Sequence, residues 1–238
     1  METIFFGFSA VLLWAGFRKL REMRLVKNIP TSKIRSIAMG LVETKGSICE
    51  TQQPLTSPIT KKECVYYSWK IEEEVRENKR TRWRTIRTKS EGNYFWMQDE
   101  TGEVLVQLKG ATIDTDSVYR SYRRRRTPLS PEVEEFLDAQ GISRDGWFNQ
   151  KKLRITEETL YPHQSIYVMG TAKDNPYVED ATQTQGHKDV MIAAGEQESF
   201  FFISDKPEHK IIRKMKWTAI ALITLGVGMC LFVVWQLL

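Results

Sequence analysis

The chain has 238 residues and a formal net charge of +5, and hydrophobic residues make up 41% of it. This length allows one or two domains with a sizeable core, and so small a charge excess points to local basic patches rather than a uniformly basic protein. The three cysteines and three histidines are far apart in sequence, which argues against a zinc site and a disulfide framework, so we expect no metal and no cofactor.

The first element is an apolar segment from Ile4 to Phe17. With the residues before it, the segment just reaches the lower length limit for crossing a membrane. A cleaved signal peptide would carry basic residues ahead of the apolar run, whereas here Glu2 precedes it and Arg18 and Lys19 follow it. Residues 1–20 are therefore predicted to be an uncleaved membrane anchor.

Strands follow this anchor. One is expected from Ile34 to Ile48, interrupted at Gly40, because a glycine within a strand commonly marks a bulge or a bend. Alternating apolar residues predict a second strand from Val65 to Ile71. We interpret Glu72 to Arg82 as a charged connection and Trp83 to Lys89 as the partner strand.

The stretch from Tyr94 to Ala111 predicts the central hairpin. Its turn is Asp99 to Gly102, in which the aspartate can bond its own backbone and the glycine accepts a positive φ. An aromatic strand before the turn and V-x-V after it are typical of a small closed barrel. The OB-type barrel is the first candidate, although a hairpin of any antiparallel β-domain fits the same motif.

The strand pattern stops between residues 112 and 127, and a helix is predicted after it. Ser130 can cap the helix, Pro131 suits its first turn and Gly141 ends it. Three apolar residues share one face of this helix: Val133, Phe136 and Leu137. We expect a helical insertion at about 128–150 that covers one face or one opening of the barrel.

Strands then resume at 152–160, 165–172 and 190–203, so that 29–205 forms one mainly β domain. Residues 206–238 predict an amphipathic juxtamembrane helix that continues into a membrane helix. The last part, from Trp217, is about 22 residues without a formal charge and would span roughly 33 Å as a helix, enough for a bilayer core.

The charges flanking the two apolar segments predict the orientation. Five basic residues follow the first segment and five precede the second: Arg18, Lys19, Arg21, Arg24 and Lys27, then Lys206, Lys210, Arg213, Lys214 and Lys216. The positive-inside rule places the domain between them in the cytoplasm. We expect a two-pass membrane protein with both termini on the opposite side.

A basic segment carries the candidate binding residues, namely Arg120 and Arg123, Arg124, Arg125 and Arg126, with the surface aromatic Tyr122 among them. Such a segment could hold the phosphates of lipid headgroups or of nucleic acid. The alternative is a solvated loop that only obeys the positive-inside rule. We expect headgroup contact.

Trp96 is a second candidate surface aromatic. It lies out of phase with Phe95 and Met97, so it would point outward from a barrel, where OB-type proteins stack bases on aromatic rings. The commoner outcome is burial under an insertion, and we expect Trp96 to lie beneath the helix at Phe136.

The sequence contains no nucleotide-binding glycine motif and no nucleophile elbow. The acidic run Glu72 to Glu74 is interpreted as a solvated strand end, because successive strand residues point to opposite faces. We therefore predict no catalytic residue and no small-molecule substrate.

Several strings resemble a known family in order and in spacing. They are Ile29–Ser36 with Gly40–Glu43, Pro54–Pro58 with Glu63–Tyr67, Trp83–Arg87 with Asp99–Gly102, Ile166–Ala172, and Phe202–Asp205. Together they are similar to the GIDE domain, also called the beside-a-membrane domain, of the mitochondrial-anchored ubiquitin ligase family. The resemblance covers about 29–216 and implies a β-barrel domain between two membrane helices.

In that family a RING finger beyond the second membrane helix carries ubiquitin transfer, whereas the sequence here ends at Leu238. We expect a non-catalytic binding or scaffold domain in membrane stress or membrane-protein quality control. A ligase component whose RING comes from another chain is the alternative, and a membrane-tethered nucleic-acid binder is a weaker one. The expected partners are the lipid membrane and other membrane proteins or a second copy, with nucleic acid unlikely.

Overall fold

The computed structural model describes residues 2–51, 54–77, 80–123, 129–142, 151–177, 189–195, 201–206 and 208–237. Its helices are α1 (Glu2–Asn28), the one-turn 3-10 helix η1 (Ile34–Ser36), α2 (Pro131–Ala139) and α3 (Glu208–Leu237). Its strands are β1 (Thr31–Ser32), β2 (Gly40–Ile48), β3 (Leu55–Thr56), β4 (Glu63–Cys64), β5 (Tyr66–Glu77), β6 (Arg80–Glu91), β7 (Tyr94–Gln98), β8 (Glu103–Gln107), β9 (Thr112–Asp114), β10 (Val118–Arg123), β11 (Leu153–Leu160), β12 (Ser165–Asp174), β13 (Val190–Ala193) and β14 (Phe202–Ser204).

Five strands close into a barrel in the order β2-β7-β8-β13-β12, with β12 pairing back onto β2. The pairing of β8 with β13 is parallel and the other barrel pairings are antiparallel. Each strand contributes apolar side chains to one buried core: Val42, Met97, Val106, Val168 and Ile192 are among them. The prediction of a mainly β chain built on a small closed barrel is confirmed.

The central hairpin lies where the sequence predicts it. Met97 of β7 pairs with Val104 of β8 across the turn. One carboxylate oxygen of Asp99 accepts hydrogen bonds from the backbone N–H groups of Thr101 (2.7 Å) and Gly102 (3.1 Å). The other accepts the backbone N–H of Ile34 at 3.0 Å, so the same aspartate shapes the turn and ties η1 to the barrel.

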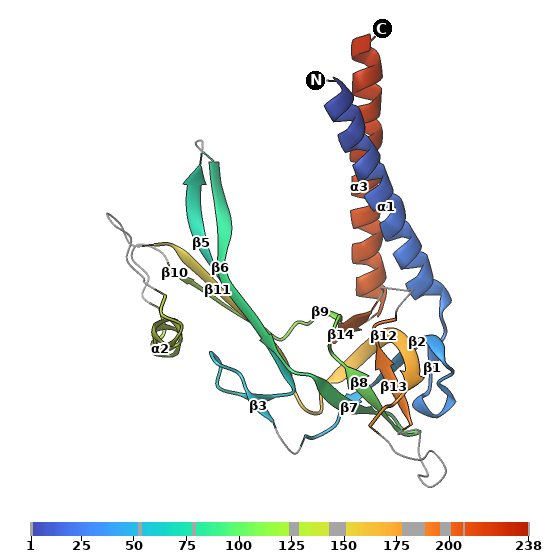
Figure 1. Ribbon diagram of the computed structural model, residues 1–238, viewed down its shortest axis with the longest axis vertical. Coiled ribbons are helices and arrows are strands. Elements are labelled where there is room, and N and C mark those ends of the chain that lie inside the picture. The colour runs from blue at the N-terminus through green and yellow to red at the C-terminus, as the bar shows by residue number, and fades with distance from the viewer. Residues whose placement is uncertain are drawn as a thin grey trace.

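A second sheet, with strand order β10-β11-β5-β6, extends from the barrel as an arm (Figure 1). Interpreting residues 72–82 as a charged connection is wrong, because β5 and β6 are strands of 12 residues that run through it. The charges do not break the strands because they pair across them. The Glu73 carboxylate, for example, accepts a hydrogen bond from Arg84 Nε at 2.9 Å.

Helix α2 covers one face of this second sheet and not the barrel, which corrects the expected position of the insertion. The predicted residues Val133, Phe136 and Leu137 are buried. The Phe136 ring meets the Trp69 ring edge to face, with 5.1 Å between ring centroids. Residues 143–150 of the expected insertion lie outside the described ranges.

Other boundaries also differ from the sequence expectation. The predicted strand from Ile34 begins as η1, and β2 itself starts at Gly40, which has a φ of +107°. Two short strands, β9 and β10, lie in the stretch 112–127, where no strand pattern is visible in the sequence. The predicted strand at 190–203 is two strands, β13 and β14.

Helices α1 and α3 form an antiparallel pair that leaves the barrel on one side, with both chain ends far from the barrel (Figure 1). Ser9 Oγ lies 3.1 Å from Cys230 Sγ in this pair. A Cβ atom at Gly16 would lie 2.6 Å from the Ile223 side chain, so the absence of a side chain there allows the close approach. Within the described residues, one helical stretch is long and apolar enough to cross a membrane, Lys216–Val234.

Candidate functional site

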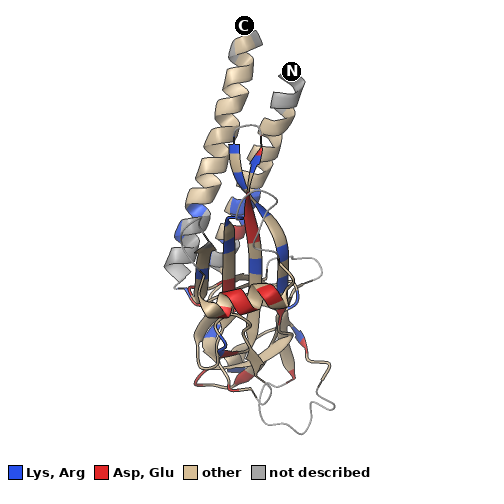
Figure 2. Cartoon of the chain, turned by 90° about the vertical axis from the view of Figure 1, so that its left-hand side faces the viewer, with Lys and Arg blue, Asp and Glu red and all other residues tan. Residues whose placement is uncertain are grey.

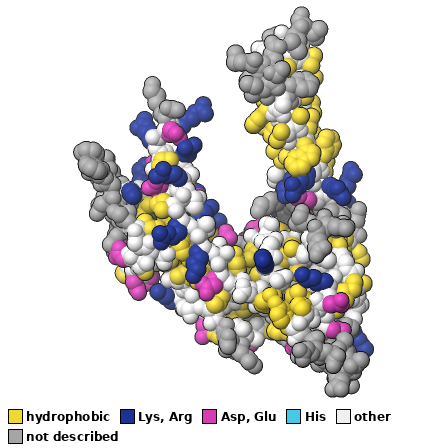
Figure 3. Space-filling model, viewed as in Figure 1, with side chains coloured by type: hydrophobic (Ala, Val, Ile, Leu, Met, Phe, Trp, Pro, Cys, Tyr) yellow, Lys and Arg dark blue, Asp and Glu magenta, His cyan; other side chains and the backbone are white. Residues whose placement is uncertain are grey.

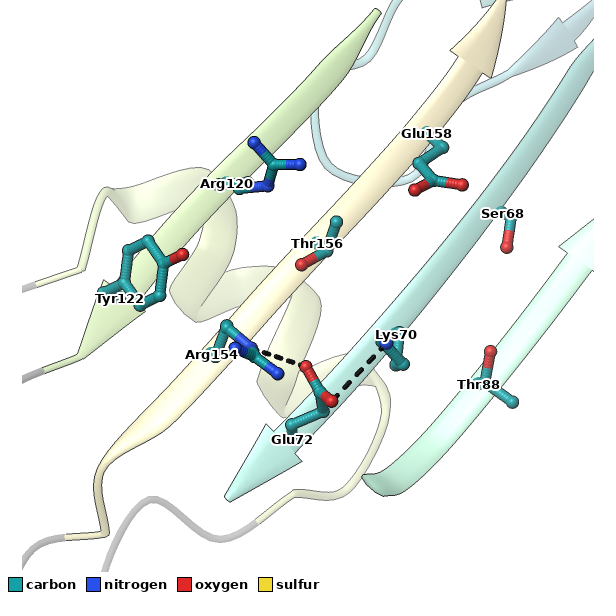
Figure 4. Close-up of a pocket in the computed structure, with 9 residues that line it drawn as sticks. All are labelled: Ser68, Lys70, Glu72, Thr88, Arg120, Tyr122, Arg154, Thr156 and Glu158. Atoms are coloured by element: carbon teal, nitrogen blue, oxygen red, sulfur yellow. Dashed lines mark hydrogen bonds and ion pairs between the residues drawn. The ribbon is translucent and has the colours of Figure 1, made fainter. Parts of the chain in front are cut away.

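The candidate site is the face of the second sheet that α2 leaves uncovered, which we call the open face. Strand alternation produces it, since odd-numbered residues such as Trp69, Ile71 and Ile155 pack into the core beneath α2. The even-numbered residues of the same strands point the other way, and Figure 4 shows them in front of the sheet with α2 behind it. Strand pairing sets Lys70 beside Thr156 and Glu72 beside Arg154.

The open face is hollowed, with a volume of about 370 Å³. Its lining is polar and charged and comes from all four strands: Ser68, Lys70 and Glu72 of β5, Thr88 of β6, Arg120 and Tyr122 of β10, and Arg154, Thr156 and Glu158 of β11 (Figure 4). Three cations and two carboxylates therefore share one shallow cleft.

Glu72 is the electrostatic centre of the hollow. Only 5% of this residue is exposed, yet its carboxylate has two basic partners. Arg154 Nε donates a hydrogen bond to it at 2.6 Å, and Lys70 Nζ lies 3.4 Å away. The hydrogen bond from Arg154 is the main reason that the pKa of Glu72 falls below its ordinary value, against the effect of burial. Glu72 is therefore ionised at neutral pH.

Aromatic rings border the cations on this face. The Arg154 guanidinium carbon lies 4.7 Å from the centre of the Trp83 ring, a cation–π contact. Trp83 pairs with Glu74, which places it on the same face as Glu72. Tyr122 is 45% exposed. The open face thus combines fixed positive charge with amphipathic aromatic rings.

The acidic run is not a solvated strand end. Glu72 and Glu73 are both buried, and each of the three carboxylates has a basic partner. Lys152 Nζ bonds Glu74 at 2.5 Å on the open face, while Arg84 bonds Glu73 on the face that α2 covers. This pairing fixes the side chains of the arm, and within the described residues it leaves Arg120 as the cation of the hollow without a carboxylate partner.

A family model described as E3 ubiquitin ligase, named GIDE, matches residues 67–234, which is most of the chain. This chain belongs to the GIDE family. No curated protein and no solved structure matches it. The match covers the whole arm from β5 onward, the barrel from β7 onward and most of α3, so the open face lies inside the family region.

The GIDE arm brings two of the sequence-predicted residues together. Arg120 and Tyr122 both line the hollow, two residues apart on β10. Arg123 ends β10, and its side chain, together with Arg124, Arg125 and Arg126, lies outside the described part of the chain, so contact between these residues and headgroups stays a prediction.

Trp96 lies elsewhere. Its ring is half-buried on the outer surface of the barrel, against Leu105, Met191 and Ala193. The expectation that it lies beneath α2 is wrong, because the tryptophan under that helix is Trp69. Periodicity correctly gave the outward direction of Trp96, but it cannot say which face of which sheet an insertion covers.

Sequence reasoning missed Lys70, Arg154, Thr156 and Glu158 as members of the site. Glu72 and Arg154 are 82 positions apart, and only the pairing of β5 with β11 joins them. The available signal was the alternation of polar residues within β11, which predicts a polar face but names no partner strand. Among the described residues, no group of three or more His, Cys, Asp or Glu side chains is placed to hold a metal ion.

Proposed function

We propose that this GIDE chain is a membrane-anchored binding and scaffold module of an E3 ubiquitin ligase-related system, and that the open face of its arm is the binding face. The observation that carries the proposal is the open face itself. The barrel interior is filled by apolar side chains and α2 occupies the other side of the arm, whereas this charged hollow is open to an incoming group. The strand order of the barrel supports an OB-type fold, which commonly serves as a binding scaffold.

The membrane part of the proposal is a two-pass topology in which α1 crosses beside α3. Their antiparallel packing and the small residues at their contact support this, since close helix approach at glycine is typical of membrane helix pairs. The basic residues at the domain ends of both helices favour a cytoplasmic domain with both termini across the membrane. The partners would then be membrane proteins or a second copy of this chain, met during membrane stress or membrane-protein quality control.

Site-specific photo-crosslinking in native membranes tests the binding face. A photoreactive amino acid in place of Thr156 lies in the hollow, and one in place of Lys109, an exposed residue after β8, is the matched control. We expect a defined adduct, either with a protein or with lipid, from position 156 and none from position 109. Equal crosslinking from both positions would contradict a specific binding face.

The proposal implies that the chain does not itself transfer ubiquitin. Incubation of the purified full chain with ubiquitin-activating and ubiquitin-conjugating enzymes tests this. We expect no conjugates above the control without the chain, and activity only when a RING-bearing partner is added. Dose-dependent conjugation by the chain alone would refute the scaffold role and favour a ligase.

A further inference from the structure

The open face lies on the same side of the molecule as the membrane helices. Helix α2 is on the outer side of the arm, and the helix pair stands on the other, in two views at right angles (Figures 1 and 2). The arm and the helix pair rise from the barrel in the same general direction, leaving a notch between them (Figure 3). The face of the sheet opposite α2 is turned toward the helix pair, and so toward the side of the barrel on which α3 would cross a bilayer (Figures 1 and 2).

The charge of this face complements an anionic surface. The cations of the hollow, Lys70, Arg120 and Arg154, outnumber its carboxylates, Glu72 and Glu158. Glu72 is already shared by Lys70 and Arg154, and within the described residues Arg120 has no carboxylate partner. A phosphate group entering the hollow could bind Arg120 without breaking the ion pair that fixes Arg154.

The aromatic residues fit the same environment. Tyr122 is exposed at the rim and Trp83 stacks on Arg154, and rings with one polar end are enriched where a membrane meets water. Lys and Arg side chains also gather where the helix pair meets the barrel (Figure 3). The hollow and these basic side chains at the base of the helix pair would then contact the same membrane surface.

We propose that the hollow binds the phosphate of an anionic phospholipid headgroup from the membrane in which the chain is anchored, with Arg120 as the main contact. The inference rests on the proposed function, because it names the ligand of that binding face. The arm would then be attached to the membrane through selected lipids, in addition to the anchoring of the chain by its helices.

Calorimetric titration of the full chain in neutral detergent tests the inference with three probes: short-chain phosphatidylglycerol, short-chain phosphatidylcholine and inorganic phosphate. We expect saturable binding of phosphatidylglycerol that weakens as salt is added, because salt screens exposed charges. Arg120→Gln should weaken it about fivefold, which corresponds to the roughly 1 kcal/mol that one arginine contributes near an anionic surface.

Arg35→Gln is the matched control, since Arg35 is exposed on η1, outside the hollow, and should leave binding unchanged. Arg120 is exposed, so Arg120→Gln should keep the thermal unfolding of the parent, which shows that the fold is intact.

Equal binding of phosphatidylcholine, equal binding of inorganic phosphate, or an unchanged Arg120→Gln variant would each overturn the headgroup assignment. If phosphatidylglycerol does not bind but position 156 crosslinks to a protein, the open face is a protein-binding face and the proposed function stands. If position 156 gives no specific adduct either, the proposed function fails with it.

Discussion

Removing Arg154 should destabilise the arm, because Glu72 would keep its charge in a buried position. Arg154 Nε donates to the Glu72 carboxylate at 2.6 Å, and only 7% of the Glu72 side chain is exposed. A hydrogen bond to a charged group is worth about 1.5–3 kcal/mol, and the 29% exposure of Arg154 argues for the middle of that range. We expect Arg154→Gln to lose about 2 kcal/mol, a fall of about 4–8 °C in melting temperature for a domain of this size.

The double variant Glu72→Gln with Arg154→Gln measures the pair directly. Because the charge and its partner are removed together, the combined loss should fall short of the sum of the single losses by about 1–2 kcal/mol. The assay is thermal unfolding of the full chain in neutral detergent, followed by tryptophan fluorescence. The exposed pair Glu77 and Arg82 on the same arm is the control, with an expected coupling below about 0.5 kcal/mol.

Acidification should remove the same stabilisation. The pKa of Glu72 is lowered in the folded state, so its contribution is fully present above the unfolded value of about 4.3 and is lost as pH falls through the folded-state pKa. As the pH falls below about 4.3, the parent should therefore lose more stability than the Arg154→Gln variant does. Additive single losses, or identical pH profiles for parent and variant, would refute this account of the hollow.

Three further changes test the packing of the arm and of the helix pair. Phe136→Ala should cost about 3 kcal/mol in unfolding free energy, because it opens a cavity under α2, and a loss below about 1 kcal/mol would mean that the helix does not cover the arm. Glu157→Ala should lower the free energy of unfolding by about 2–3 kcal/mol, because this buried carboxylate accepts hydrogen bonds from two backbone N–H groups and one hydroxyl of the loop before β4. Urea unfolding measures the loss, and an unchanged stability would contradict these contacts. In a Ser9→Cys variant, we expect a disulfide with Cys230 to form readily, because the two side chains are in contact. Adding Gly16→Leu should separate the helix pair and slow this reaction, and equal rates in the two chains would argue against close packing at that glycine.

Local rules in the sequence were enough for several elements. The hairpin turn at Asp99 follows from a side chain that bonds the backbone two and three residues later, whereas the positive φ expected at Gly102 is wrong. The position of α2 follows from the proline at its first turn, and from Gly141, which has a φ of +64° just after its end. The apolar stretch of α3 follows from length and composition alone. Each of these signals involves residues close together in the chain, so the sequence carries it directly.

Only the tertiary structure decided what these elements face. The charged run after Ile71 became strand because acids on β5 meet bases on β6 and β11, and such pairings leave no mark on local periodicity. The tryptophan beneath α2 is Trp69 and not Trp96, since which sheet the helix covers depends on chain topology. The hollow exists because β5 and β11 are neighbours although Glu72 and Arg154 are 82 positions apart. Hydrophobic patterning determines the direction of each side chain, while the partner of each side chain is determined by long-range strand pairing.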